Sequence, residues 1–283
     1  MKLKIREISM EALTQQYDAL MFDAYGVLVS RQGMLPGVRE VLTTLNERRI
    51  PWWIVSNGSS RPQNAYGRYF RDLGMPVKDD QIVVSGALLT PFFAERDLVG
   101  QPTLTLGPEG SRELARLAGG CPVSPGEDFS VLVIGNQTGF HFPDDWDLML
   151  TTLIGRIESG KETTLIVPNP DLIFPRGEGR WGVTSGALGR MLEDILHQRF
   201  GAGNFPEIHR LGKPHRPVFV EARRRAGTDS VAMLGDQLDT DIRGAKDFGI
   251  DAVLVKGGVT PVDSDRLADC PPDWILQAMS FDR

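Results

Sequence analysis

The stretch that decides the fold is Ala19-Leu20-Met21-Phe22-Asp23-Ala24-Tyr25-Gly26-Val27-Leu28. Its first four residues form a short apolar run, which is typical of a strand buried on both faces of a sheet. The residues after Asp23 can turn the chain, so that the carboxylate of Asp23 projects above the sheet. A carboxylate in that place can act as a nucleophile or a metal ligand, or it can cap a turn.

Six further apolar runs of the same kind follow, at Pro51–Val55, Ile82–Val84, Val131–Ile134, Thr164–Val167, Val231–Leu234 and Ala252–Val255. Between the first two strands, Pro36–Arg49 begins with a proline and places its apolar residues, Val38, Val41, Leu42 and Leu45, on one stripe. This pattern predicts a crossover helix with Pro36 in its first turn. The repeated order of strand and helix predicts an α/β fold with a doubly wound, mostly parallel sheet, whose ligands bind beyond the carboxyl ends of the strands.

The second predicted strand ends in Val55-Ser56-Asn57-Gly58-Ser59-Ser60. A hydroxyl, an amide side chain and flexible backbone N–H groups could converge there on the oxygens of a phosphate ahead of a helix. The alternative is ordinary loop chemistry, because Asn-Gly followed by serines is a common turn sequence.

Lys213 stands between a glycine and a proline in Arg210-Leu211-Gly212-Lys213-Pro214. The two neighbours restrict the backbone, so the ammonium could neutralise both a nucleophilic carboxylate and a phosphate. The alternative is a solvated surface lysine, since charged residues mostly lie at the surface.

Three acids follow the run Val231–Leu234, in Gly235-Asp236-Gln237-Leu238-Asp239-Thr240-Asp241. Carboxylate oxygens clustered at a turn into a helix suit Mg²⁺, which takes one or two carboxylates together with water and phosphate oxygens. Capping of the helix by Asp236 or Asp239 is the structural alternative.

The composition narrows the classes of partner. A chain of 283 residues with 41% hydrophobic and 24% charged residues can bury a full core, and its formal net charge of −6 argues against nucleic acid or an anionic membrane as a partner. The chain has two cysteines, Cys121 and Cys270. So few cysteines in a chain of this length favour a protein of a reducing compartment over one held together by disulfides. The N-terminus lacks a signal-peptide pattern and no apolar run is long enough to span a bilayer, so we expect a cytoplasmic protein.

These four strand-end motifs, in this order, resemble the haloacid dehalogenase (HAD) superfamily of hydrolases. Asp23 matches the nucleophile position of that family, Ser56 its phosphate-binding hydroxyl, Lys213 its lysine, and Asp236 with Asp241 its acidic metal motif. Segments between the second and third motifs resemble the class IIA branch with a type 2 cap, namely Ser85–Ala87, Leu106–Gly110, Pro168–Asp171 and Ser185–Leu188, as does Val255–Thr260 near the C-terminus. The resemblance implies a Rossmann-like parallel-sheet core, residues 1–88 and 207–283, with an inserted α/β cap domain, residues 89–206.

The resemblance also implies a phosphatase chemistry. Asp23 would attack phosphorus and form an aspartyl-phosphate, with Ser56 and Lys213 as further catalytic residues. The expected cofactor is Mg²⁺, held by Asp23, Asp236 and the backbone carbonyl of Tyr25, while Asp241 acts through water or orients Lys213.

The expected substrate is a small phosphorylated metabolite. Its phosphate would be bound by Ser56, Asn57, Gly58 and Lys213. Asn169 and Asp171, in the turn Pro168–Asp171, are expected substrate-loop residues of the cap, and cap-mediated homodimers fit the resemblance.

Tyr25 departs from the family pattern, because family phosphatases carry a second aspartate two positions after the nucleophile. That acid protonates the leaving oxygen and later activates water, and a phenol with a pKa of about 10 is a poor base near neutrality. Either the chain hydrolyses substrates with good leaving groups, or it recruits another acid from among Asp171, Asp239 and His215, or it turns over little.

Two rival functions follow from the same residues. The stretches Asp23–Gly26 and Ser56–Ser59 also resemble 2-haloacid dehalogenases, which attack carbon without a metal. The acid cluster of Asp236 and Asp241 argues against that rival, since a metal-free displacement needs no such carboxylates. A phosphate-binding protein with impaired catalysis is the second rival, and Tyr25 motivates it.

Overall fold

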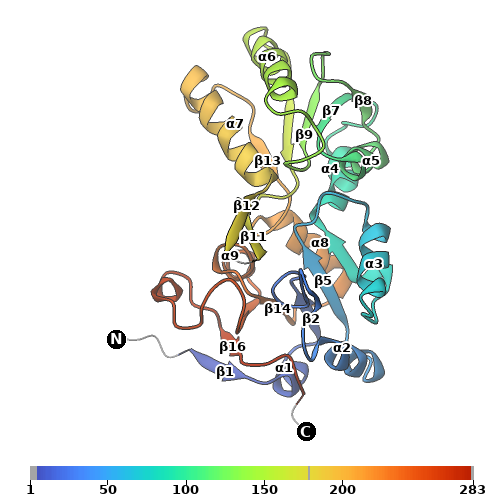
Figure 1. Cartoon of the computed structure of the whole chain (residues 1–283), viewed down its shortest axis with the longest axis vertical. Helices are drawn as coiled ribbons and strands as arrows, with labels where there is room; N and C mark the ends of the chain where they lie inside the picture. The colour runs from blue at the N-terminus through green and yellow to red at the C-terminus, as the bar shows by residue number, and fades with distance from the viewer. Residues whose placement is uncertain (1–4, 178, 282–283) are drawn as a thin grey trace. The chain divides into compact units, whose positions relative to one another are not determined.

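The computed structural model describes residues 5–177 and 179–281, and the chain forms two compact units (Figure 1). Within the described residues, unit 1 comprises residues 5–56, 63–84 and 213–281, and unit 2 comprises residues 57–62, 85–177 and 179–212. The chain therefore passes from one unit to the other after Ser56, Pro62, Val84 and Gly212. The domain boundaries inferred from the sequence stay a prediction, and they differ from these units in the segments 57–62, 85–88 and 207–212, which belong to unit 2.

Unit 1 is built on a seven-stranded sheet with the order β1-β16-β15-β14-β2-β5-β6, in which all neighbours are parallel. The central strands are almost wholly apolar and fully buried, as expected of a parallel sheet covered on both faces. The strands are β1 (Arg6–Ile8), β2 (Ala19–Phe22), β5 (Trp52–Ser56), β6 (Ile82–Val84), β14 (Val231–Gly235), β15 (Asp251–Val255) and β16 (Trp274–Leu276).

The helices of unit 1 are α1 (Met10–Gln16), α2 (Val38–Glu47), α3 (Gln63–Asp72), α8 (Arg216–Ala226) and α9 (Arg243–Phe248). Shorter helical turns are η1 (Asp79–Gln81), η3 (Leu238–Ile242) and η4 (Asp265–Ala268). Helices α8 and α9 pack through Phe219 and Phe248, whose rings are stacked with centroids 5.6 Å apart. Helix α2 buries the predicted apolar stripe against the sheet.

One detail of the α2 prediction is wrong. Pro36 does not lie in the first helical turn, because the helix begins at Val38 and Gly37 is its N-cap. Gly37 has a positive φ of 79°, and a Cβ there would lie 2.0 Å from the carbonyl oxygen of Met279. The positive φ and the close approach of Met279 thus both require glycine at the N-cap.

Unit 2 contains a five-stranded parallel sheet with the order β13-β10-β9-β7-β8. The strands are β7 (Pro102–Leu106), β8 (Cys121–Val123), β9 (Val131–Ile134), β10 (Thr164–Val167) and β13 (Ile208–Arg210). The helices are α4 (Leu89–Glu95), α5 (Glu109–Leu117), α6 (Asp144–Glu158) and α7 (Ser185–Phe200), preceded by the turn η2 (Ser85–Leu88). Trp146 and Met149 of α6 and Leu192 of α7 join Leu132 and Leu165 of the strands in one core cluster.

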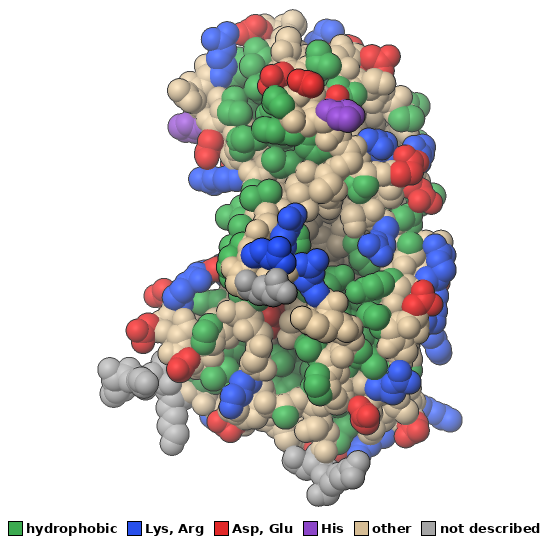
Figure 2. Space-filling view, in the orientation of Figure 1, with side chains coloured by type: hydrophobic (Ala, Val, Ile, Leu, Met, Phe, Trp, Pro, Cys, Tyr) green, Lys and Arg blue, Asp and Glu red, His purple; other side chains and the backbone are tan. Residues whose placement is uncertain are grey.

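Two small antiparallel hairpins complete the fold: β3 (Val29–Ser30) with β4 (Gly33–Met34), and β11 (Ile173–Gly177) with β12 (Arg180–Val183). The second hairpin belongs to unit 2 and carries Ile173, Trp181 and Val183, each more than half exposed. Figure 2 shows apolar and basic side chains gathered over β11 and β12. Alternation along this ribbon places Ile173 opposite Val183 on one face.

The predicted doubly wound α/β fold is confirmed, and each of the seven predicted apolar runs forms a parallel strand. The structure adds strands that the apolar runs did not reveal, among them the five-residue β7. In the part of the chain that the structure describes, no helix is both long enough and apolar enough to cross a membrane.

Candidate active site

Asp23 and Asp236 lie at the carboxyl ends of two neighbouring central strands of unit 1. Phe22 of β2 pairs with Leu234 of β14, so the acids that follow these strands come to the same edge of the sheet. The strands that follow β2 in the chain, β5 and β6, extend the sheet to one side, and β15 and β16 extend it to the other. The two acids therefore stand where the strand order reverses, the place where ligands bind in such sheets.

Lys213 joins two acids that lie far from it in the sequence. Its Nζ donates to Oδ1 of Asp23 over 2.6 Å and lies 2.7 Å from Oδ1 of Asp241. All three side chains are buried. Such charge-assisted contacts hold the carboxylate of Asp23 in one orientation.

Asp241 is held by the turn that contains it. The backbone N–H groups of Asp236 and Gln237 both donate to Oδ2 of Asp241 over 3.1 Å. The adjacent Gly235 leaves room for this carboxylate, since a Cβ there would lie 2.1 Å from Cβ of Asp241. One oxygen of Asp241 therefore caps the turn η3 while the other faces Lys213.

The carboxylate of Asp236 is enclosed by the loop that follows β15. Val259 donates its backbone N–H to Oδ2 of Asp236 over 2.8 Å, and Thr260 donates its backbone N–H to the carbonyl of Asp236 over 2.9 Å. Glycines make the close packing possible, because a Cβ on Gly26 would lie 2.1 Å from Oδ2 of Asp236 and a Cβ on Gly258 would lie 2.1 Å from its Cβ. Asp236 is fully buried as a result.

Burial dominates the electrostatics of this cluster. It raises the pKa of Asp23 to about 7. The charge of Lys213 opposes this rise, and the charge of Asp241 adds to it. Burial, followed by the charges of Asp23 and Asp241, raises the pKa of Asp236 well above its ordinary value. Burial alone would lower the pKa of Lys213, but the two carboxylates beside it outweigh that effect and raise it.

The cluster fits a hard divalent cation. Oxygens of Asp23, Asp236 and Asp241 lie within 4.8 Å of one another, and Oδ1 of Asp236 is buried without a hydrogen-bond partner among the described residues. A buried carboxylate oxygen that lacks a partner is costly unless a cation binds it. When all three are ionised, the carboxylates beside the one ammonium carry an excess of two negative charges, which a dication would neutralise. Carboxylate oxygens are also the donors that such a cation prefers.

Ser56 and Tyr25 complete the predicted residues of unit 1. Ser56 is the buried last residue of β5, which pairs with β2, so it lies at the same edge of the sheet as Asp23. Tyr25 is 47% exposed and forms an isolated bridge with Val29. The roles assigned to the Ser56 hydroxyl and to the Tyr25 carbonyl stay predictions.

The other predicted residues, Asn57, Gly58, Asn169 and Asp171, belong to unit 2. Nδ2 of Asn57 donates to Oδ1 of Asp171 over 2.8 Å, and the backbone N–H of Asp171 donates to Oδ1 of Asn169 over 2.9 Å. The carbonyl of Gly58 accepts from the backbone N–H of Gly86 over 3.0 Å. These residues are thus bonded to one another or to unit 2, and their predicted contacts with substrate stay predictions.

The three acids considered as replacements for the missing general acid occupy different surroundings. Asp239 is exposed and paired with Arg266, whose NH2 group lies 2.8 and 2.6 Å from its two oxygens. This pairing engages both carboxylate oxygens of Asp239 with one guanidinium. Asp171 accepts the hydrogen bond from Asn57, and His215 is the N-cap residue of α8.

Sequence reasoning missed the partners that hold these acids in place. Val259 and Thr260 were noticed only as part of a family-like segment, and the structure shows that they enclose Asp236. The sequence did contain a signal for this contact. Gly257 and Gly258 follow a buried strand next to β14, and residues this small allow a loop to pack closely against an acid. The hydrogen bond between Asn57 and Asp171 had no such signal.

Comparison with known proteins agrees with this architecture. Residues 20–121 match the family model described as haloacid dehalogenase-like hydrolase, and residues 210–280 match a HAD-hydrolase-like model. The chain is 26% identical to an acid sugar phosphatase of Staphylococcus aureus over 94% of this chain and 96% of that protein.

Two solved structures share the whole fold. A possible sugar phosphatase of the HAD superfamily from Cytophaga hutchinsonii has a TM-score of 0.84 and 25% identity, covering 99% of this chain and 100% of its own. A p-nitrophenyl phosphatase from Archaeoglobus fulgidus has a TM-score of 0.76 and 28% identity, covering 93% and 97%. These matches confirm the resemblance inferred from the motifs: the chain belongs to the superfamily of haloacid dehalogenase-like hydrolases.

Proposed function

We propose that this protein is a Mg²⁺-dependent phosphatase that hydrolyses a small phosphorylated metabolite through an aspartyl-phosphate on Asp23. The observation that carries the proposal is the buried cluster at the ends of β2 and β14, where Lys213 orients Asp23 beside the carboxylates of Asp236 and Asp241. The phosphatase names of the similar proteins support a phosphate monoester as the substrate class.

The cation would be held by Asp23, Asp236 and the backbone carbonyl of Tyr25. Asp241 would act on it through water or orient Lys213. Bound there, Mg²⁺ would supply positive charge that neutralises phosphate oxygens. In the first step an oxygen of Asp23 attacks phosphorus, the bond from phosphorus to the ester oxygen breaks, and the alcohol leaves. Lys213 keeps the carboxylate oriented and offsets negative charge, which is the main task of a protein in phosphoryl transfer.

In the second step water attacks phosphorus, the bond from phosphorus to Asp23 breaks, and inorganic phosphate is released. Both steps move a proton, first to the leaving oxygen and then from water. Tyr25 stands where family phosphatases have the acid for this work, so we expect slow turnover of substrates with poor leaving groups. In the proposed role the second unit is the cap.

The proposal is tested by hydrolysis of p-nitrophenyl phosphate and of a panel of sugar phosphates. Activity should require Mg²⁺, disappear in excess EDTA, and be lost in Asp23→Asn. Equal activity in EDTA would refute the metal assignment, and chloride release from a 2-haloacid without metal would favour a dehalogenase.

One observation supports a second candidate, a phosphate-binding protein with little turnover. The position of Tyr25 lacks the acid that both proton transfers need, and Asp239 is engaged with Arg266. Binding of inorganic phosphate with Mg²⁺, seen as a rise in melting temperature, together with no hydrolysis of any monoester, would favour this candidate.

A further inference from the structure

Two of the four points at which the chain passes between the units adjoin residues of the proposed chemistry. Asn57 follows Ser56 directly, and Gly212 directly precedes Lys213. Both Asn57 and Gly212 belong to unit 2. Whatever holds these two residues therefore acts, through single peptide bonds, on the backbone of Ser56 and of Lys213.

Asn57 and Gly212 meet at the turn Asn169–Asp171. Nδ2 of Asn57 donates to Oδ1 of Asp171 over 2.8 Å. On its other side, the amide faces Gly212, where a Cβ would lie 2.4 Å from Oδ1 of Asn57 and 2.8 Å from Cδ of Pro170. The Asn57 side chain is buried and thus enclosed by the turn and by a glycine that leaves room for it.

The turn itself is held firmly, so the carboxylate of Asp171 has a defined place. Its backbone N–H donates to Oδ1 of Asn169 over 2.9 Å, and Oγ of Ser185 donates to the carbonyl of Asn169 over 3.1 Å. At the start of α7, a Cβ on Gly186 would lie 2.2 Å from the carbonyl oxygen of Pro170 and 2.3 Å from that of Asp171. Only glycine allows α7 to pack this closely on the turn.

The residues after Asn57 are anchored in unit 2 as well. The carbonyl of Gly58 accepts from the backbone N–H of Gly86, Oγ of Ser59 donates to the carbonyl of Gly135 over 2.6 Å, and Oγ of Ser111 donates to the carbonyl of Ser59 over 2.8 Å. Ser59 is buried. The segment Asn57–Pro62 is therefore held at several points, of which the bond to Asp171 lies nearest to Ser56 in the chain.

We infer that Asn57 and Asp171 form a positioning pair that sets the backbone of Ser56 and of Lys213 for the proposed phosphatase reaction, on which this inference rests. Asp171 acts through Asn57 and neither donates a proton nor binds substrate. Its Oδ1 accepts the hydrogen bond from the amide of Asn57. Asn57 in turn restrains the chain at the two points where it passes between the units, after Ser56 and after Gly212. Misplacement of Ser56 and Lys213 by a fraction of an ångström weakens the alignment on which phosphoryl transfer depends.

The test compares Asp171→Ala, Asp171→Asn, Asn57→Ala and the double alanine variant, with kcat and KM measured separately on p-nitrophenyl phosphate in Mg²⁺. Asp171→Ala and Asn57→Ala should each lower kcat/KM by about 10-fold to 10²-fold. The double variant should cost little more than either single one, because both break the same contact. Asp171→Asn keeps an acceptor oxygen for Asn57 and should stay within about threefold of the wild type.

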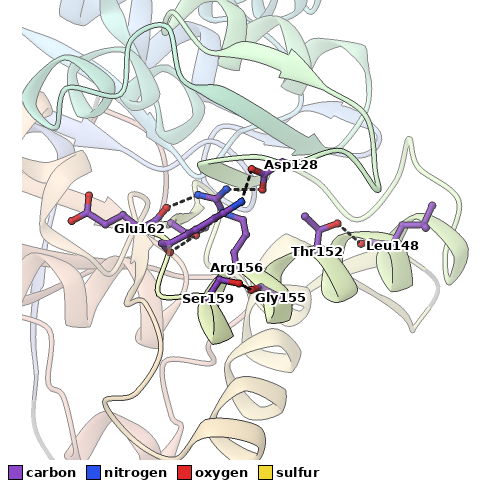
Figure 3. A network of polar contacts seen from close by, with 9 residues as sticks. Asp128, Leu148, Thr152, Gly155, Arg156, Ser159 and Glu162 are labelled. Atoms are coloured by element: carbon purple, nitrogen blue, oxygen red, sulfur yellow. Dashed lines mark hydrogen bonds and ion pairs between the residues drawn. The ribbon is translucent and has the colours of Figure 1, made fainter.

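These outcomes separate a positioning role from a chemical one. A general acid or a charged substrate ligand would be lost equally in Asp171→Asn and Asp171→Ala, and loss of an acid would also change the pH profile of kcat. Equal impairment of both variants, or full activity of Asp171→Ala, would overturn the inference. The matched control is Asp128→Ala, which removes another carboxylate of unit 2, one that accepts from Arg156 over 2.6 Å (Figure 3), and should leave kcat unchanged.

Hydrogen exchange tests the pair independently of turnover. Backbone amides of residues 57–61 should exchange faster in Asp171→Ala than in the wild type or in Asp171→Asn, and Asp128→Ala should not change them. If the wild type hydrolyses no monoester but this exchange pattern appears, the proposed function fails while the pairing stands. If the wild type is active and Asp171→Ala changes neither exchange nor kcat, the pairing is wrong.

Discussion

Lys213 donates from Nζ to Oδ1 of Asp23 over 2.6 Å, although 190 positions separate the two residues in the chain. The contact is buried, so the ammonium and the carboxylate interact more strongly than they would in water. Asp241 lies on the other side of the same ammonium. The lysine thus connects the proposed nucleophile with the acid turn after β14, and it gives Asp23 a fixed orientation before any substrate binds.

Tyr25→Asp restores the acid that family phosphatases carry two positions after the nucleophile. We expect kcat on a sugar phosphate to rise by about 10²–10⁴-fold, the usual contribution of general acid–base catalysis. The gain on p-nitrophenyl phosphate should be smaller, because its leaving group needs little protonation. Steady-state kinetics on both substrates measures the difference, with Tyr25→Phe as the control that should behave like the wild type. No gain on the sugar phosphate would mean that another residue already supplies the acid.

Asp236→Asn tests the cation site through stability. Without metal the variant should melt at a higher temperature than the wild type, because it removes a fully buried carboxylate whose Oδ1 has no hydrogen-bond partner among the described residues. A saturating cation at a hundred times its Kd stabilises the native state by about 2.7 kcal/mol, and only the wild type should gain this from Mg²⁺. Thermal melting in EDTA and in Mg²⁺ measures both effects. An equal rise for both proteins would place the cation elsewhere.

Substitution of Arg156 tests how much its buried hydrogen bonds stabilise unit 2. Its buried guanidinium donates to Thr163 Oγ1 over 2.9 Å, to Asp128 Oδ1 over 2.6 Å and to the carbonyl of Glu162 over 2.6 Å (Figure 3). Arg156→Leu would leave the carbonyl and the hydroxyl without this donor, and we expect a loss of about 2–4 kcal/mol. Arg156→Lys should recover only part of it, because an ammonium cannot reproduce the planar fork.

Calorimetric melting measures these losses, and the partner variant serves as the control. Asp128→Asn should cost much less stability than Arg156→Leu, because Asp128 is 59% exposed and solvent screens its pairing. Equal effects of Arg156→Leu and Asp128→Asn would show that the ion pair, rather than the buried hydrogen bonds, carries the stability.

The surroundings of His209 predict that the free energy of unfolding depends on pH. Burial first, and then the charge of Arg96, lowers the pKa of His209 below its ordinary value. The unfolded chain therefore takes up a proton at a higher pH than the folded one, so the free energy of unfolding falls as the pH drops below about 6.5. His209→Gln should remove this loss. The melting temperatures at about pH 7 and about pH 5 should differ less in the variant than in the wild type. An equal difference in both proteins would contradict the assignment to His209.

The sequence predicted the central strands because these are buried on both faces and read as uninterrupted apolar runs. It did not predict β1, β8, β13 or β16, which are only three residues long and lie at or near the sheet edges. It also did not predict β7, because threonines alternate with leucines there and no continuous apolar run appears. The hairpin β11–β12 was missed for a different reason. Its side chains are largely exposed, so no burial pattern marks the strands.

The acids and the lysine of the candidate site could be located from sequence because each follows a buried strand or stands in a restricted turn. Their mutual contacts could not, because the distance from Lys213 to Asp23 depends on packing across the whole sheet. The contact of Asn57 with Asp171 is a clearer case. It joins residues 114 positions apart, in a place that only the tertiary fold creates.

The covalent intermediate on Asp23 is the most direct test of the proposed function. Wild-type protein would be mixed with a phosphate monoester and Mg²⁺, quenched rapidly in acid, and analysed by intact mass and peptide mapping. We expect one added phosphoryl group on the peptide that contains Asp23, and we expect this group to be absent in EDTA and in Asp23→Asn. Hydrolysis that proceeds without this adduct, or an adduct that maps to another residue, would contradict it.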